Sequence, residues 1–181
     1  MKKIALVMVV LCSAALTTFA QTSDAVGRFS IGLEAGLPTT SGYSFIIGGS
    51  LKYEHPIQEG LFLTGSIGYS RVKMKSVDTG LSDEDMEDLE DLGIDTDGLG
   101  GGSFGIIPIK VGAKYYFAEK IFGEAQLGAG INTQSGGGTS FIYSPGVGYN
   151  FSNNFEGGLR YEGWSNNGTL GQLGVRLAYK F

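Results

Sequence analysis

The sequence has little of the chemistry on which most enzymes and metal sites depend. It contains one cysteine, Cys12, and one histidine, His55. Cys12 lies in an apolar stretch near the N-terminus, and the rest of the chain therefore has no disulfide, no thiolate metal ligand and no thiol nucleophile. His55 has no cysteine or second histidine with which to form a site, so we interpret it as a solvated residue of a turn from His55 to Gly60. We expect no enzyme activity, no metal and no cofactor.

Long apolar runs are also missing. The run from Ile4 to Leu16 follows Lys2 and Lys3 and leads into Thr17-Thr18-Phe19-Ala20. A basic start, a short apolar core and small residues at a cleavage point are typical of a secretory signal peptide. The run is too short for a membrane-spanning helix, which needs about 20 residues. We predict a signal peptide over residues 1–20 and a single domain over residues 21–181.

Strict alternation of apolar and polar residues runs through the remaining chain. The final segment, QLGVRLAYKF, places Leu173, Val175 and Leu177 on one face, with Arg176 and Lys180 on the other. A period of two indicates a β-strand with one apolar and one polar face. Seven earlier segments follow the same pattern, near residues 29–37, 43–54, 61–70, 104–117, 121–131, 141–151 and 155–162. Their lengths suit tilted membrane-spanning strands, which need about 9–11 residues.

The charged side chains decide which face of each segment meets lipid. A register shifted by one residue would turn Lys110, Arg160 and Arg176 towards hydrocarbon. Each basic residue near the membrane midplane costs about 2–4 kcal/mol, so three cost about 6–12 kcal/mol, comparable with the whole stability of a domain. We therefore predict an all-β fold, an eight-stranded antiparallel up-and-down transmembrane β-barrel with its apolar face outward. A soluble, lipocalin-like barrel would need the opposite arrangement.

Aromatic residues of the outward phase gather at the two ends of the segments. Tyr179 and Phe181 fall at one rim, and Tyr43, Tyr69 and Tyr143 fall towards the other. Aromatic girdles of this kind mark the two interfaces of a membrane. The distribution supports the same orientation of the strands.

The inward face combines glycine and small polar residues with long charged side chains. An eight-stranded barrel is only wide enough for side chains to fill it, and unpaired charges in such a space are costly. We predict a salt-bridged plug, with a gated conduit as the alternative, formed by Arg28, Glu34, Lys52, Glu54, Lys110, Lys114, Glu124, Glu156, Arg160, Glu162, Arg176 and Lys180. Four residues near the predicted extracellular mouth are apolar although they fall on the inward, otherwise polar face: Ile46, Ile106, Ile142 and Trp164. They either line a vestibule for a hydrophobic small molecule or form a dry cap over the plug.

Acidic charge is concentrated in one predicted extracellular loop of about residues 72–103. Ten of the 18 acidic residues lie between Asp78 and Asp97. Their spacing does not match an EF-hand, so we interpret this segment as a solvated acidic loop and not as a cation site. Before the acids, Arg71, Lys73 and Lys75 fall on the outward phase. They either contact lipopolysaccharide phosphates at the membrane surface or are ordinary solvated charges.

Two sequence features resemble a known group of proteins. They are the segment from Ile107 to Phe117, IPIKVGAKYYF, and the aromatic C-terminal residue Phe181 with Tyr179 two positions before it. The chain resembles the small bacterial outer-membrane β-barrel families, OmpA-barrel-like and OmpX-like, and especially the porin-like outer-membrane β-barrel proteins of Bacteroidota.

This resemblance implies a location in the bacterial outer membrane and contact with its lipids. It also implies recognition of the C-terminal strand by the barrel-assembly machinery. We expect a monomer with no nucleic-acid partner. Two functions remain open: a non-enzymatic envelope protein acting through its structure and surface loops, or a narrow porin-like channel for small solutes or hydrophobic compounds.

Overall fold

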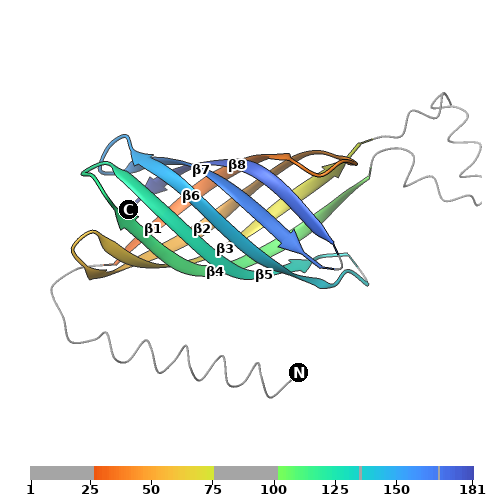
Figure 1. Ribbon diagram of the computed structural model, residues 1–181, viewed down its shortest axis with the longest axis horizontal. Coiled ribbons are helices and arrows are strands. Elements are labelled where there is room, and N and C mark those ends of the chain that lie inside the picture. Colours follow the sequence, from red (N-terminus) through yellow and green to blue (C-terminus); the bar gives the residue numbers. More distant parts are fainter. Residues whose placement is uncertain (1–26, 76–101, 135, 167) are drawn as a thin grey trace, which may run out of the picture.

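The computed structural model describes residues 27–75, 102–134, 136–166 and 168–181. The predicted signal peptide and most of the predicted acidic loop lie outside these residues. The described residues form eight strands, β1 (Arg28–Pro38), β2 (Tyr43–Gln58), β3 (Leu61–Met74), β4 (Ser103–Tyr116), β5 (Ile121–Asn132), β6 (Thr139–Asn150), β7 (Phe155–Ser165) and β8 (Thr169–Lys180) (Figure 1). No helix long and apolar enough to cross a membrane occurs among the described residues.

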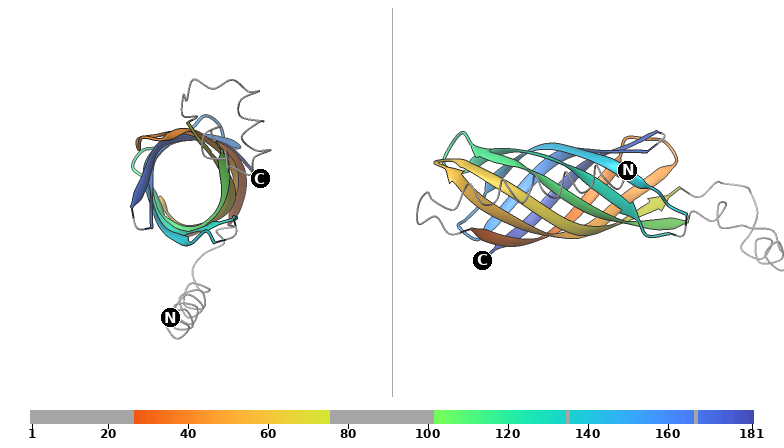
Figure 2. Two further views of the ribbon diagram at one scale, coloured as in Figure 1. Left: turned by 90° about the vertical axis from the view of Figure 1, so that its right-hand side faces the viewer. Right: turned by 90° about the horizontal axis from the view of Figure 1, so that it is seen from below.

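The strands close into a ring. Each strand pairs antiparallel with the next, and β1 also pairs with β8, with Ser30 opposite Lys180 and Pro38 opposite Gln172. The ring is evident when the barrel is viewed along its axis (Figure 2, left). Closure leaves no strand with an unpaired edge. The predicted eight-stranded up-and-down barrel is confirmed.

The two ends of the barrel differ in their connections. One end, which we call the terminal end, carries the C-terminus, the start of β1 and the β2–β3, β4–β5 and β6–β7 turns (Figure 1). The other, the loop end, carries the β1–β2, β5–β6 and β7–β8 connections and the facing ends of β3 and β4. Short turns face the periplasm in barrels of this kind and longer loops face outward. We therefore orient the terminal end towards the periplasm.

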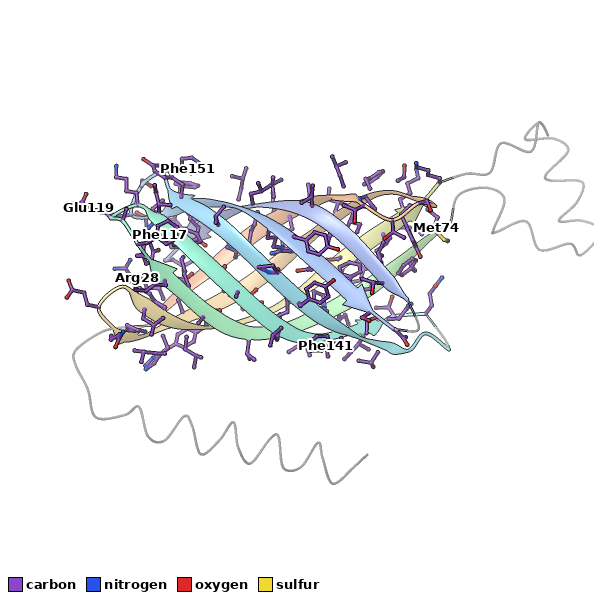
Figure 3. All side chains as sticks on the ribbon, in the orientation of Figure 1. Arg28, Met74, Phe117, Glu119, Phe141 and Phe151 are labelled. Carbon is purple, nitrogen blue, oxygen red and sulfur yellow. The ribbon has the colours of Figure 1, made fainter. Side chains whose placement is uncertain are left out.

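Alternation along the strands separates an apolar outer surface from a polar interior. On the outside, the side chains of Leu33 and Leu177 are 77% and 63% exposed. Inside, Lys114 and Glu162 are almost completely buried. Large apolar side chains such as Phe117, Phe141 and Phe151 project away from the wall (Figure 3). The predicted face assignment is therefore correct for these residues.

The structure corrects the prediction at the ends of β2. The strand does not end before a turn at His55 but continues through Pro56, which lies opposite Phe62, and the turn is confined to residues 59–60. Gly60 adopts a φ of 76°, the left-handed conformation that permits so tight a turn. At the other end a register shift between Tyr43 and Phe45 inserts an extra residue. This bulge reverses the facing of Tyr43, which packs towards the interior and not outward as predicted.

Candidate functional site

The middle of the lumen is filled by charged side chains. Five carboxylates and six cations form ion pairs there, and they come from β1, β2, β4, β5, β7 and β8: Glu34, Lys52, Glu54, Lys110, Lys114, Glu124, Glu156, Arg160, Glu162, Arg176 and Lys180. Within the described strands β3 and β6, the interior carries no charged side chain. These strands contribute small polar groups such as Thr64, Ser70 and Ser144 instead. We call the eleven ion-paired residues, five carboxylates and six cations, the ionic layer.

Glu156 is at the centre of the part of the ionic layer that lies nearest the terminal end. Its carboxylate lies 2.6 Å from Lys114 Nζ, 3.0 Å from Lys52 Nζ and 3.1 Å from Arg176 Nη1. Lys180 Nζ is 3.7 Å away. Lys52 and Lys114 also contact Glu54, at 2.9 and 2.8 Å. One carboxylate therefore links β2, β4, β7 and β8 across the interior.

Towards the loop end, two arginines extend the same network. Arg176 reaches Glu34 at 3.5 Å, and Arg160 joins Glu34 to Glu162 at 2.5 and 3.4 Å. Glu162 in turn holds Lys110 at 2.6 Å. The eleven charges are thus continuous from one side of the lumen to the other.

Little space remains between these side chains. The void within the ionic layer has a volume of about 30 Å³ and is lined in part by Lys52, Glu124 and Arg176. This volume is enough for only one or two water molecules. Arg160 also lines the void, and its buried Nε atom makes no hydrogen bond among the described residues, although it lies 3.4 Å from a carboxylate oxygen of Glu162.

The structure does not bring Arg28 into the ionic layer, contrary to the prediction. Arg28 is the first residue of β1 and its side chain is exposed at the terminal end (Figure 3). The alternation places it on the inward phase opposite Glu54. At the barrel rim, however, an inward-phase side chain can turn into solvent, because it has no further strand residue beyond it.

Three aromatic side chains close the terminal end beneath the ionic layer. The Tyr116 ring centroid lies 5.6 Å from that of Phe62 and 5.4 Å from that of Phe122. Lys114 Nζ stands 3.9 Å from the centroid of Phe122, a cation–π distance. Asn150 donates a hydrogen bond to the Tyr116 hydroxyl at 3.0 Å. The sequence analysis did not recognise this aromatic layer, although Phe62 and Phe122 have the same parity as the inward residues Thr64 and Glu124.

An apolar layer closes the loop end above the ionic layer. The predicted residues Ile46, Ile106, Ile142 and Trp164 converge there, each no more than 4% exposed, and Val72 joins them. Tyr43, Phe104 and Leu170 pack over this cluster. The Trp164 indole donates a hydrogen bond to Glu162 at 2.8 Å, which ties the apolar layer to the ionic layer.

A cavity of about 400 Å³ opens above the apolar layer at the loop end. Of the four residues predicted to line a vestibule, Ile106 and Trp164 line this cavity, whereas Ile46 and Ile142 do not. The remaining lining comes mainly from residues that the sequence analysis did not select: Thr40, Tyr43, Phe104, Asn132, Gly138, Ser140, Asn166, Gly168, Thr169 and Leu170.

The three basic residues at the end of β3 lie on the outer surface, as their parity predicts. Arg71, Lys73 and Lys75 are all exposed. Arg71 Nε donates a hydrogen bond to the Ser103 hydroxyl at 2.9 Å, and Lys73 Nζ lies 5.9 Å from the centroid of the Phe45 ring. We call these three residues the basic stripe.

Metal-ligating residues do not converge anywhere in the described part of the chain. No group of three or more histidine, cysteine, aspartate or glutamate side chains has the geometry to hold an ion among residues 27–75, 102–134, 136–166 and 168–181. The segment that contains the acidic residues Asp78 to Asp97 lies outside these ranges.

A closed ring of eight strands with an apolar outer surface and a charged, filled interior defines the class of membrane-spanning β-barrels. The family model described as outer membrane protein beta-barrel domain matches residues 4–181, and the chain belongs to this family. The protein is therefore a bacterial outer-membrane β-barrel of the small eight-stranded type.

Solved structures of similar fold come from proteins with different activities. Ail, the attachment invasion locus protein of Yersinia pestis, in complex with the heparin analogue sucrose octasulfate, has 20% sequence identity and a TM-score of 0.55, over 86% of this chain and 97% of Ail. The outer membrane enzyme PagL has 18% identity and a TM-score of 0.54, over 84% of this chain and 98% of PagL. No curated protein matches the sequence. At these levels of sequence identity the similarity establishes only a shared fold, and one of the proteins with this fold is an enzyme.

Proposed function

We propose that this protein is a non-enzymatic, non-conducting barrel of the outer membrane that acts through envelope structure and through the surface that it presents at its loop end. The continuous ionic layer supports this proposal, because the void lined by Lys52, Glu124 and Arg176 within it is only about 30 Å³. An apolar layer covers the ionic layer on one side and an aromatic layer covers it on the other. An ion crossing the barrel would have to pass all three.

The energy of the ion pairs favours a permanent plug and not a gate that opens. Breaking a buried pair by removing one partner costs about 3–5 kcal/mol, because the remaining charge is left uncompensated. Glu156 alone holds four cations. A conducting path through the ionic layer would separate several such pairs together. The alternative function, a narrow channel for small solutes or hydrophobic compounds, would require such a path.

The absence of enzyme activity is part of the proposal, since the fold itself does not decide it. His55 lies near the terminal end, where its Nδ1 is 3.5 Å from the Tyr53 hydroxyl. Within the described residues no serine, threonine or cysteine side chain forms a hydrogen bond with it, and its position at the terminal end is remote from the outer leaflet. The buried carboxylates of the lumen are all held by cations and are closed off from substrate.

The partners that we propose are lipids and the assembly machinery. We propose that the basic stripe, which is exposed at the loop end of β3, contacts lipopolysaccharide phosphates. The C-terminal strand β8 ends in Tyr179 and Phe181, which pack with Phe155 and Phe29 at the terminal end. We propose that this strand is what the barrel-assembly machinery recognises. We also propose that the barrel is a monomer.

Planar-bilayer conductance tests the proposed function. The refolded protein, with folding verified by the mobility of unheated samples on electrophoresis, is added to a bilayer in concentrated potassium chloride. We expect no discrete current steps, whereas an open porin examined under the same conditions gives them. Reproducible steps that scale with the amount of folded protein would contradict the plug and favour the channel.

A further inference from the structure

We propose that the cavity at the loop end is a binding site for an uncharged sugar ring. The inference adds a ligand to the proposed function but does not depend on a closed lumen, because the cavity lies above the apolar layer. Its volume of about 400 Å³ falls within the range of about 300–1,000 Å³ that small-molecule sites occupy. It therefore suits a ligand of one or two rings.

The described lining of the cavity is uncharged, which favours an uncharged ligand. Among residues 27–75, 102–134, 136–166 and 168–181, none that lines the cavity is acidic or basic. The nearest charged layer is separated from it by the buried cluster of Ile46, Val72 and Ile142, and the basic stripe faces the outside of the barrel. A phosphate, sulfate or carboxylate ligand would find no counter-charge in the described part of the lining.

The lining combines two kinds of surface that a sugar ring requires together. Tyr43, Phe104, Trp164 and two aliphatic side chains provide apolar and aromatic contact. Amides and hydroxyls complete the lining, from Thr40, Asn132, Ser140, Asn166 and Thr169. A pyranose has C–H groups on its ring faces and hydroxyls around its edge, so that it can satisfy both surfaces. A purely apolar ligand would desolvate the amides without replacing their hydrogen bonds, which costs free energy.

Several of these polar groups retain hydrogen-bonding capacity. The side chains of Ser140, Asn166 and Tyr43 make no hydrogen bond to another described residue. Asn132 is oriented, because its Oδ1 accepts a hydrogen bond from the backbone N–H of Gln134 at 2.9 Å. Its amide N–H groups are then the part that can serve a ligand.

The floor of the cavity is pre-organised. Trp164 is only 3% exposed, and its indole is fixed by the hydrogen bond to Glu162 at 2.8 Å. Thr40 fixes one wall, since its hydroxyl donates to the carbonyl of Thr169 at 3.2 Å and accepts from the N–H of Gly171 at 3.1 Å. A site whose side chains are already held loses less entropy when it binds.

Two sources can supply such a ligand at the loop end. One is a free oligosaccharide outside the cell, and the other is the sugar portion of lipopolysaccharide in the same membrane. Both present uncharged pyranose rings, so the chemistry of recognition is shared. The experiment must therefore separate the two sources.

Trp164 makes the site directly observable, because it is the only tryptophan of the chain. Folded protein in detergent micelles is titrated with the methyl glycosides of glucose, galactose, mannose and N-acetylglucosamine, and tryptophan fluorescence and calorimetry are recorded. Further titrations use glucose 6-phosphate, cyclohexanol, and purified lipopolysaccharide with and without its outer sugars. We expect saturable binding of at least one neutral glycoside, weaker binding of its phosphate, and no saturable response to cyclohexanol.

A matched pair of variants assigns binding to the cavity. Phe104→Ala removes an aromatic wall of the cavity, whereas Phe141→Ala removes a lipid-facing ring at the same end of the barrel. Asn166→Ala removes an exposed polar group of the lining and leaves the packed layer intact. We expect the affinity to fall about tenfold or more in Phe104→Ala and Asn166→Ala and to be unchanged in Phe141→Ala. Electrophoretic mobility verifies that each variant is folded.

The remaining results either contradict the proposal or identify the source of the ligand. The proposal is overturned if no neutral glycoside binds at millimolar concentration, if cyclohexanol binds in place of the sugars, or if binding survives both cavity variants. Tighter binding of complete lipopolysaccharide than of lipopolysaccharide without outer sugars identifies the membrane as the source. Equal binding of the two, with a neutral glycoside bound in the cavity, identifies a free saccharide.

Discussion

At the scale of single residues, Glu156 is the side chain whose removal should cost most. Glu156→Gln keeps the volume but leaves Lys52, Lys114 and Arg176 without their shared carboxylate. We expect the free energy of unfolding to fall by about 3–5 kcal/mol, as for other broken buried ion pairs. Urea unfolding of the refolded barrel in lipid vesicles, followed by fluorescence, measures this loss.

The control for this substitution is Glu119→Gln. Glu119 lies in the exposed β4–β5 turn at the terminal end (Figure 3). The same chemical change there should alter the free energy of unfolding by no more than about 0.5 kcal/mol. Equal losses in the two variants would mean that the carboxylate of Glu156 contributes no specific pairing.

Parity along the strands predicted which charged residues point inward, but it could not predict their partners. Lys110 of β4 pairs with Glu162 of β7, and Lys52 of β2 reaches Glu124 of β5, so both pairs cross the lumen between strands that are not neighbours. Such contacts depend on the tilt and stagger of the closed ring, which no single segment encodes. Arg28 shows a second limit, because parity does not determine whether a side chain at the rim remains inside.

At the scale of a strand, an arginine introduced at two outward positions of β8 tests how the cost of a charge depends on its depth in the membrane. Leu177 faces outward opposite Leu33, the central residue of β1, and is 63% exposed. Leu177→Arg should lower the free energy of unfolding in lipid vesicles by about 2–4 kcal/mol, because it places a cation in hydrocarbon. Thr169→Arg, at the loop end of the same strand, should cost about 0–1 kcal/mol. A loss in Leu177→Arg as small as in Thr169→Arg would mean that β8 does not face lipid.

The outward end of β3 tests the proposed contact with lipopolysaccharide. Replacing Arg71, Lys73 and Lys75 together by glutamine removes the basic stripe but leaves the inward residues of β3 unchanged. We expect the folded variant to retain less lipopolysaccharide through purification, and the difference to vanish in concentrated salt, which screens exposed charges. Lys120→Gln, at the opposite end of the barrel, is the control. Unchanged retention in the triple variant would identify the stripe as ordinary solvated charge.

The centres of the strands were predicted more accurately than their ends. Alternation located all eight centres because each spans a membrane with one apolar face. It failed at Pro56, where pairing with Phe62 continues although proline usually ends a strand, and at Tyr43, where a bulge changes the parity. Both are consequences of the pairing with β3, and a period of two within one segment contains no information about a neighbouring strand.

At the scale of the whole molecule, three layers of different chemistry divide the interior. The apolar layer lies towards the loop end, the ionic layer lies in the middle, and the aromatic layer lies towards the terminal end. The layers are coupled, because Trp164 bonds to Glu162 and Lys114 stands over Phe122. The sequence indicated the first two layers through residues that break or follow the polar-inside rule. The cavity above them is lined mainly by the ends of six strands, with a smaller share from the connections between strands, and the arrangement of these parts depends on closure of the ring.

The proposed plug predicts how the stability of the barrel responds to salt. Dissolved ions screen charges only where they can approach them, and the void of about 30 Å³ among the paired charges holds only one or two water molecules. Measured in vesicles of uncharged lipid without lipopolysaccharide, the free energy of unfolding should therefore change by less than about 1 kcal/mol between about 0.05 M and 1 M sodium chloride. The same charges in a water-filled lumen would be screened, and the barrel would lose several times that amount. A large loss would thus argue against the plug independently of conductance, because it would arise even if the ions that enter the lumen never cross it.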